Sequence, residues 1–70
     1  MEILQRATLT SREAQCLAGI AEGLTNSDVA VKLQISTPTV ALHLQNAKRK
    51  LGAATREHAV ALAIKSGLLS

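Results

Sequence analysis

Residues 24–52 read LTNSDVAVKLQISTPTVALHLQNAKRKLG, and two N-terminal capping signals divide this stretch into two helices. Thr25 and Asp28 have the spacing of a capping box, in which a hydroxyl and a carboxylate three residues apart accept hydrogen bonds from each other's backbone N–H groups. Ser36 is a good N-cap for a second helix. The two helices are expected over residues 26–34 and 37–51.

The second of these helices has a narrow apolar side and a basic C-terminal end. Pro38 is tolerated in its first turn, where the backbone N–H groups lack partners, and Gly52 supplies a left-handed stop. Its apolar residues repeat at helical spacing along one side, at Val40, Leu44, Ala47 and Leu51. Two helices joined by a tight turn, the second with such a side, form a helix-turn-helix.

One further helix is expected on each side of this pair. Thr10 and Glu13 have the same capping-box spacing, which predicts a helix over residues 11–22, and Thr55 is an N-cap for a helix over residues 56–66. The sequence therefore predicts an all-α fold, a compact four-helix bundle that contains the helix-turn-helix. The inward residues are expected to be Ala14, Leu17, Ile20 and Ala21 in the first helix, and Ala59, Val60, Ala63 and Ile64 in the last.

The length allows one small domain with a thin core, which is expected over residues 9–70, while residues 1–8 are expected to be an N-terminal extension or the end of a linker. Residues 1–35 carry three basic and four acidic side chains, whereas residues 36–70 carry five basic and one acidic. The second half is therefore the better candidate to face an anionic partner. The chain has no aromatic residue, which disfavours single-stranded nucleic acid, whose bases stack on aromatic rings.

Several classes of protein are disfavoured by what the sequence lacks. One cysteine, Cys16, excludes an internal disulfide and is expected to be a small buried thiol. The lack of a secretion signal and of an apolar run of about 18 residues predicts a cytoplasmic protein with no membrane segment. Cys16, His43 and Asp28 are isolated as catalytic candidates, and neither His43 nor His58 has a ligand partner one helical turn away. No enzymatic activity, metal or cofactor is expected.

The helix over residues 37–51 has a second side, opposite its apolar one. Placing its residues at 100° intervals puts four polar or exposed positions there, at Leu42, Gln45, Asn46 and Arg49. In a major groove Leu42 can pack against a thymine methyl group, whereas Gln45 and Asn46 can bond adenine edges. Arg49 can bond guanine or a phosphate. The alternative is that Leu42 is an ordinary exposed leucine and that the basic run at residues 48–50 is a solvated helix end.

Residues beside this second side are expected to hold DNA phosphates. Thr37 and Thr39 lie at the helix N-terminus, where hydroxyls, free N–H groups and the helix dipole favour an anion. Further candidates flank this side of the helix, with Lys48 on the edge that also carries Ala41, and His43 and Lys50 on the other edge. Phosphate contacts of this kind set the register, while base contacts read the sequence.

Residues 9–52 and 55–69 resemble the LuxR-type helix-turn-helix family. The matching motifs are LTxRE at 9–13, Gly23 with Thr25 and Asn26, IS at 35–36, TVxxH at 39–43, KLG at 50–52, Arg56, AV at 59–60 and GLL at 67–69. The resemblance implies the four-helix C-terminal domain of a bacterial transcription regulator, which binds duplex DNA, usually as a dimer, under a separate N-terminal sensing or phosphorylatable domain. The segment HLQNAKRKLG is most similar to the acyl-homoserine-lactone branch, which acts in quorum sensing.

The resemblance also implies roles for particular residues. It places Ala41, Leu42 and Gln45 at the groove. Ala41 departs from the family pattern, because lysine is common there, and lysine is also frequent where Ser27 stands near a phosphate. Dimerisation is implied through the last helix, whose outer side carries His58, Ala61, Leu62 and Lys65. Leu62 with Ala61 can form a small two-fold contact, and the alternative is that Leu62 is merely exposed.

Glu13 and Arg56 both point toward the apolar sides of their helices, which predicts a partly buried pair that joins the first helix to the last. The alternative is that each side chain caps its own helix. Our principal hypothesis is a sequence-specific, double-stranded DNA-binding output domain that acts as a two-fold dimer on an inverted repeat, with half-sites about 34 Å apart. The alternative is a helical module that contacts RNA polymerase or a sensor domain and binds DNA only non-specifically.

Overall fold

The protein has four α-helices in the part of the chain that the structure, a computed structural model, describes. This part covers residues 9–69, so the extension expected at residues 1–8, together with residue 70, lies outside the described residues. The helices are α1 (Ser11–Ala21), α2 (Asn26–Leu33), α3 (Thr37–Leu51) and α4 (Arg56–Lys65). The predicted all-α fold is confirmed, and the predicted helix ends agree with the observed ones to within one residue.

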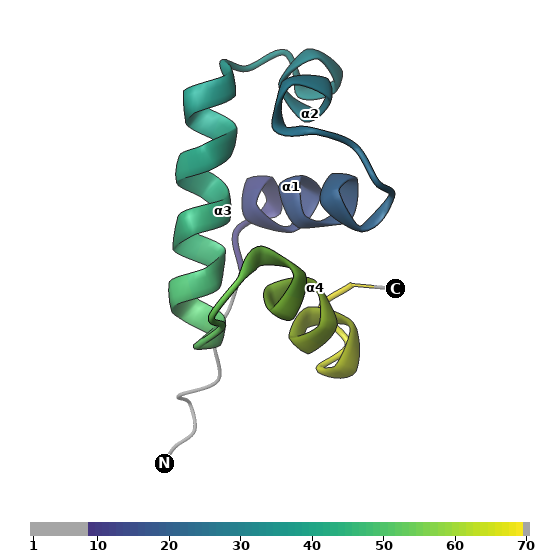
Figure 1. Ribbon diagram of the computed structural model, residues 1–70, viewed down its shortest axis with the longest axis vertical. Coiled ribbons are helices and arrows are strands. Elements are labelled where there is room, and N and C mark those ends of the chain that lie inside the picture. The colour runs from purple at the N-terminus through teal and green to yellow at the C-terminus, as the bar shows by residue number, and fades with distance from the viewer. Residues whose placement is uncertain (1–8, 70) are drawn as a thin grey trace.

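The longest helix, α3, lies along one side of the molecule. Figure 1 shows α3 running along the long axis, with α1, α2 and α4 all on the same side of it, α2 above α1 and α4 below. α1 packs against each of the other three helices. Among residues 9–69, one side of α3 therefore has no helical neighbour.

Hydroxyl side chains fix where the helices begin. At α1, Thr10 Oγ1 accepts a hydrogen bond from Glu13 N at 3.1 Å, and Glu13 Oε1 accepts one from Thr10 N at 2.9 Å. Thr25 and Asp28 repeat this arrangement at α2 with distances of 3.0 and 3.1 Å. Single serine and threonine hydroxyls cap α3 and α4. The predicted capping boxes are thus confirmed, and each one satisfies two backbone N–H groups that a helix leaves without partners.

The turn between α2 and α3 is short because α2 ends abruptly at Gln34. This residue adopts the left-handed conformation with φ of 59°, which costs a side chain other than glycine about 1 kcal/mol. The cost is offset by hydrogen bonds that close the helix end, since Gln34 N donates to Val31 O at 3.3 Å and Ile35 N donates to Ala30 O at 3.0 Å. These bonds fix the direction in which the chain enters α3.

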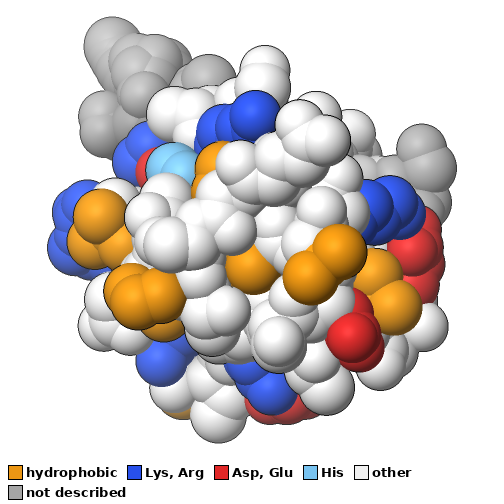
Figure 2. All heavy atoms as spheres, turned by 90° about the horizontal axis from the view of Figure 1, so that it is seen from above, with side chains coloured by type: hydrophobic (Ala, Val, Ile, Leu, Met, Phe, Trp, Pro, Cys, Tyr) orange, Lys and Arg blue, Asp and Glu red, His pale blue; other side chains and the backbone are white. Residues whose placement is uncertain are grey.

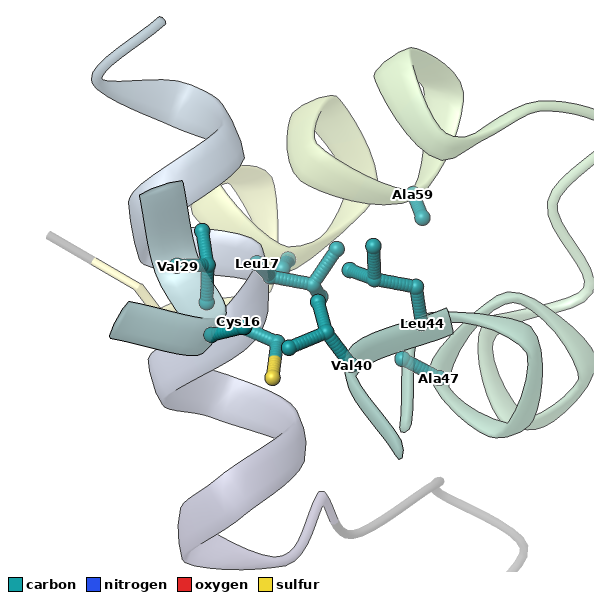
Figure 3. Close-up of a cluster of buried hydrophobic side chains, with 9 residues drawn as sticks. Cys16, Leu17, Val29, Val40, Leu44, Ala47 and Ala59 are labelled. Carbon is teal, nitrogen blue, oxygen red and sulfur yellow. The ribbon is translucent and has the colours of Figure 1, made fainter. Parts of the chain in front are cut away.

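The core is built from small and medium aliphatic side chains that come from all four helices. Leu17 of α1 and Val40 of α3 are completely buried, and Figure 3 shows them turned toward each other, with Val29 of α2 and Ala59 of α4 beside them. Two predicted inward residues are wrong: Ala21 at the end of α1 is exposed, and Ile64 of α4 is 49% exposed. The buried side of α4 runs through Ala59 and Ala63, and a residue one position further along lies about 100° around the helix.

α1 and α2 approach closely at Gly19. A Cβ atom added to Gly19 would lie 2.6 Å from Val29 Cγ2, closer than real Cβ atoms come to a neighbour. Val29 is only 1% exposed and cannot move away without disturbing the core. A residue without a side chain at position 19 therefore sets the distance between α1 and α2, a contact that the apolar pattern of the sequence does not predict.

Candidate nucleic-acid interface

The five residues predicted to face DNA bases lie away from the buried side of α3. We call them the outer face of α3: Ala41, Leu42, Gln45, Asn46 and Arg49. Four of them are exposed and Asn46 is half-buried. The buried side of the same helix is formed by Val40, Leu44 and Ala47. α3 is therefore two-sided, with the core on one side and a largely polar surface on the side that no other helix of the described part of the chain covers (Figure 1).

Leu42 is the apolar residue of the outer face, and 57% of it is exposed. Exposure alone does not distinguish it, because Val31 and Ile64 are 78% and 49% exposed on other helices. At the end of the molecule where α2 lies and α3 begins, hydrophobic side chains occur singly or in small groups between polar ones (Figure 2). What distinguishes Leu42 is its position. It lies on the outer face of α3 together with the polar side chains of Gln45 and Arg49.

Some polar groups around the outer face are already oriented by local hydrogen bonds. Arg49 Nη2 donates to Asn46 Oδ1 at 3.2 Å, so these two side chains act together at the C-terminal half of α3. At the other end of the helix, the hydroxyls of Ser36 and Thr39 lie 2.7 Å apart. Side chains held in this way lose less conformational entropy when they bind a partner.

The residues predicted to hold phosphates are not equivalent in the structure. Ser27 and Thr37 are exposed at the first turns of α2 and α3, while Thr39, His43 and Lys48 are half-buried. Lys50 differs from the rest, because its ammonium contacts Glu13 of α1, with a distance of 2.8 Å from Lys50 Nζ to Glu13 Oε1. Lys50 therefore joins α3 to α1, a role that its flanking position in the sequence does not predict.

Glu13 is the one buried charged residue among those that the structure describes, with 4% of it exposed. Burial alone would raise the pKa of this carboxyl, but the hydrogen bond and charge of Lys50, together with the bonds to Thr10, outweigh it and lower the pKa below its usual value. The ionised carboxylate thus serves two structures at once, the cap of α1 and the contact between α1 and α3.

The predicted pair between Glu13 and Arg56 is wrong. Glu13 is bound to Lys50, and the guanidinium of Arg56 instead reaches α2, where Nη1 donates to Asn26 Oδ1 at 2.6 Å. Arg56 Nε also lies 3.5 Å from Oε2 of the exposed Glu57. Each of the two side chains instead binds a residue of another helix, Lys50 of α3 for Glu13 and Asn26 of α2 for Arg56.

The lowered pKa of Glu13 predicts how stability depends on pH. Because the folded state binds this proton more weakly than the unfolded chain does, the stabilisation is fully present above the pKa of unfolded Glu13, around 4.5, and is lost as pH falls through the lower folded value. We expect Glu13→Gln to be less stable at neutral pH and to show a flatter loss of stability in acid. Urea unfolding at several pH values measures this, with the exposed Glu57→Gln as the control. An equally steep profile in Glu13→Gln would rule out Glu13 as the source.

The predicted dimer residues lie on α4 as expected, but their large apolar residue, Leu62, is less exposed than predicted. His58, Ala61 and Lys65 are exposed, whereas Leu62 is half-buried, so the exposed large apolar side chain of α4 is Ile64. His58 is also engaged locally, since its Nδ1 accepts a hydrogen bond from Ala54 N at 3.1 Å. A surface centred on Leu62 alone is therefore smaller than predicted.

The residues considered for catalysis and metal binding lie at positions that favour a structural role. Cys16 is completely buried, as predicted, and burial raises the pKa of its thiol, which leaves it a poor nucleophile. Among residues 9–69, no three histidine, cysteine or acidic side chains gather where they could hold a metal ion. Within the same residues, every helix is too short or too polar to cross a bilayer.

Known proteins similar to this chain are bacterial regulators. Residues 7–63 match the model of the family described as bacterial regulatory proteins, luxR family. The chain is 45% identical over 65 residues to the transcriptional activator protein VanR of Vibrio anguillarum, covering 93% of this chain and 27% of that protein. It is 44% identical over 61 residues to VjbR of Brucella ovis, an HTH-type quorum sensing-dependent transcriptional regulator, covering 87% of this chain and 24% of that protein. The chain thus spans about a quarter of the length of these relatives.

Solved structures show the same architecture. The transcription factor GerE superimposes with a TM-score of 0.85 at 32% identity, over 89% of this chain and 92% of that one. The response regulator ChrA of a heme-sensing two-component system gives 0.83 at 38% identity, over 91% of this chain and 32% of that one. The proteins that this chain resembles are transcription regulators, which is consistent with the prediction that the chain is not an enzyme. The chain belongs to the luxR family of bacterial regulatory proteins and has the helix-turn-helix fold of its solved members.

Proposed function

We propose that this luxR-family DNA-binding domain reads the sequence of double-stranded DNA with α3 in the major groove, as the output domain of a transcription regulator. The observation that carries the proposal is that α3 has two different sides. Its buried side holds Val40 and Leu44, while its outer face has no helical neighbour in the part of the chain that the structure describes. An α-helix presented in this way fits the width of the major groove.

Within the groove, the outer face supplies different kinds of contact. Leu42 offers an apolar surface to a thymine methyl group, and the amide of Gln45 can bond an adenine edge. Arg49, oriented by Asn46, reaches guanine or a phosphate. Ala41 leaves a shorter side chain where a lysine would add a charge, so we expect affinity to depend more on shape and hydrogen bonds there than on charge.

We further propose that the domain acts as a two-fold dimer on an inverted repeat, with α4 at the interface. The support is the exposed surface of α4, which carries Ala61 beside the half-buried Leu62 and carries Ile64 three residues after Ala61, on the other flank. Two copies related by a two-fold axis would place their α3 helices about 34 Å apart, one turn of duplex DNA. Because the relatives are about four times longer, we infer that a separate regulatory domain controls this dimer.

The test is selection of bound duplexes from a randomised pool at near-physiological salt, where non-specific phosphate binding is weak. We expect an enriched inverted repeat from the parent, and Leu42→Ala should relax the preference at one base pair by about 1 kcal/mol or more. Val31→Ala is the matched control, because it shortens an exposed aliphatic side chain on α2. Recovery of a single half-site would contradict the dimer, and recovery of no motif would favour a module that contacts RNA polymerase or a sensor domain.

A further inference from the structure

A shallow hollow of about 210 Å³ opens beside the outer face of α3, where α2, α3 and α4 come together. Two of its lining residues, Ala41 and Gln45, belong to that outer face. The others come from all three helices: Asn26, Leu44, Lys48 and Arg56. The hollow therefore continues the proposed reading surface sideways, toward the position that a DNA strand bordering the groove would occupy.

The charges that line the hollow have one sign. Lys48 comes from α3 and Arg56 from the first turn of α4, and no carboxylate lines the hollow among the described residues. Arg56 forms an ion pair with Glu57, whose Oε2 lies 3.5 Å from Arg56 Nε but which does not line the hollow. Two cations brought from separate helices to one open depression create a site for an anion.

Asn26 orients the guanidinium of Arg56. Its Oδ1 accepts the hydrogen bond from Arg56 Nη1 at 2.6 Å across 30 residues of sequence, which joins the first turn of α2 to the first turn of α4. A guanidinium has five N–H donors in a fixed fork, so a bond to one acceptor leaves other donors free. Donors held in this way match the oxygens of a phosphate better than a freely rotating ammonium does.

From this arrangement we infer that the hollow holds one phosphodiester of the DNA backbone, with Arg56 and Lys48 as donors and Asn26 as the residue that positions Arg56. The inference rests on the proposed function, because it requires α3 to lie in the groove. It assigns Arg56 a contact with DNA in place of the pair with Glu13 that the sequence predicts. A phosphate bound between α2, α3 and α4 would fix the register of Gln45 on its base pair.

The test is the salt dependence of binding to a labelled duplex of arbitrary sequence, measured by fluorescence anisotropy between 50 and 200 mM KCl. Each phosphate contact contributes about 0.9 to the slope of log K against log salt concentration. We expect Arg56→Gln and Lys48→Gln each to reduce the slope by about 1 and to weaken binding about fivefold, since 1 kcal/mol of ion pairing corresponds to that factor. Arg56→Lys keeps the charge and should retain most of the slope.

Lys32→Gln is the matched control, because it removes the same charge from α2 at a site where Lys32 Nζ lies 3.4 Å from Glu22 Oε1. Circular dichroism and urea unfolding of each variant show whether it is folded. Folded Arg56→Gln and Lys48→Gln with the slope of the control would overturn the inference while leaving the proposed function standing. A parent domain with no affinity for the duplex would overturn both. Binding of inorganic phosphate that Arg56→Gln abolishes, together with a duplex slope that Arg56→Gln leaves unchanged, would assign the hollow to a free anion instead of the DNA backbone.

Discussion

Lys50→Met is expected to lower the free energy of unfolding by about 2 kcal/mol, because it leaves the buried carboxylate of Glu13 without its cation. The value lies below the ~3–5 kcal/mol typical of a broken, fully buried pair, since the side chain of Lys50 is 29% exposed and Thr10 still bonds Glu13. A domain of this size is stabilised by only about 4–10 kcal/mol, so the loss is large. Urea unfolding followed by circular dichroism measures it, because the chain has no aromatic fluorophore.

Two comparisons separate the ion pair from a general effect of the substitution. Lys48→Met makes the same change on the same helix at a lysine that forms no ion pair with another of residues 9–69, and we expect it to alter stability by no more than about 0.5 kcal/mol. Combining Lys50→Met with Glu13→Gln removes both charges and should recover part of the loss. Equal destabilisation by the two lysine variants would show that the contact between α1 and α3 does not depend on this pair.

Leu17→Ala is expected to have the largest effect on stability, about 3 kcal/mol, because Leu17 is completely enclosed at the centre of the core and its loss leaves a cavity. DNA binding should decline only as far as the domain unfolds. Leu42→Ala is the matched variant, since it makes the same chemical change at a residue that is 57% exposed. It should change stability by less than about 0.5 kcal/mol.

The same two variants, measured for both unfolding and duplex binding, separate the core from the reading surface. We expect Leu17→Ala to lose stability and to bind normally once corrected for the folded fraction, and Leu42→Ala to do the opposite. A Leu42→Ala variant that loses stability as well would mean that Leu42 packs against the domain and does not lie free on α3.

The local signals in this sequence predicted the helices well because they act within a few residues. The capping pairs of Thr10 with Glu13 and Thr25 with Asp28 appear in the structure as expected, and so does the left-handed Gly52 that ends α3. Each of these depends on backbone groups three or four residues away. The two sides of α3 were predictable for the same reason, since helical periodicity assigns a direction to every side chain.

Contacts between helices were predicted less well, because periodicity gives the direction of a side chain but not its height along the bundle. Periodicity directs both Glu13 and Arg56 inward, yet Glu13 meets Lys50, and Arg56 meets Asn26. A long lysine side chain can also bend from the edge of a helix toward a buried acid, which a helical wheel does not represent. The hollow between α2, α3 and α4 depends on how these helices are placed relative to one another, so the sequence alone did not predict it.

The two-sided build of α3 has a consequence for how such a regulator changes its target. Ala41, Leu42 and Gln45 lie outside the buried cluster, so the fold places few demands on them. If they read the operator as proposed, mutation can exchange them one at a time without passing through unstable intermediates. Natural selection for a new binding site and for a durable domain then acts on different residues of one helix, which allows gene-regulatory networks to be rewired without rebuilding the protein.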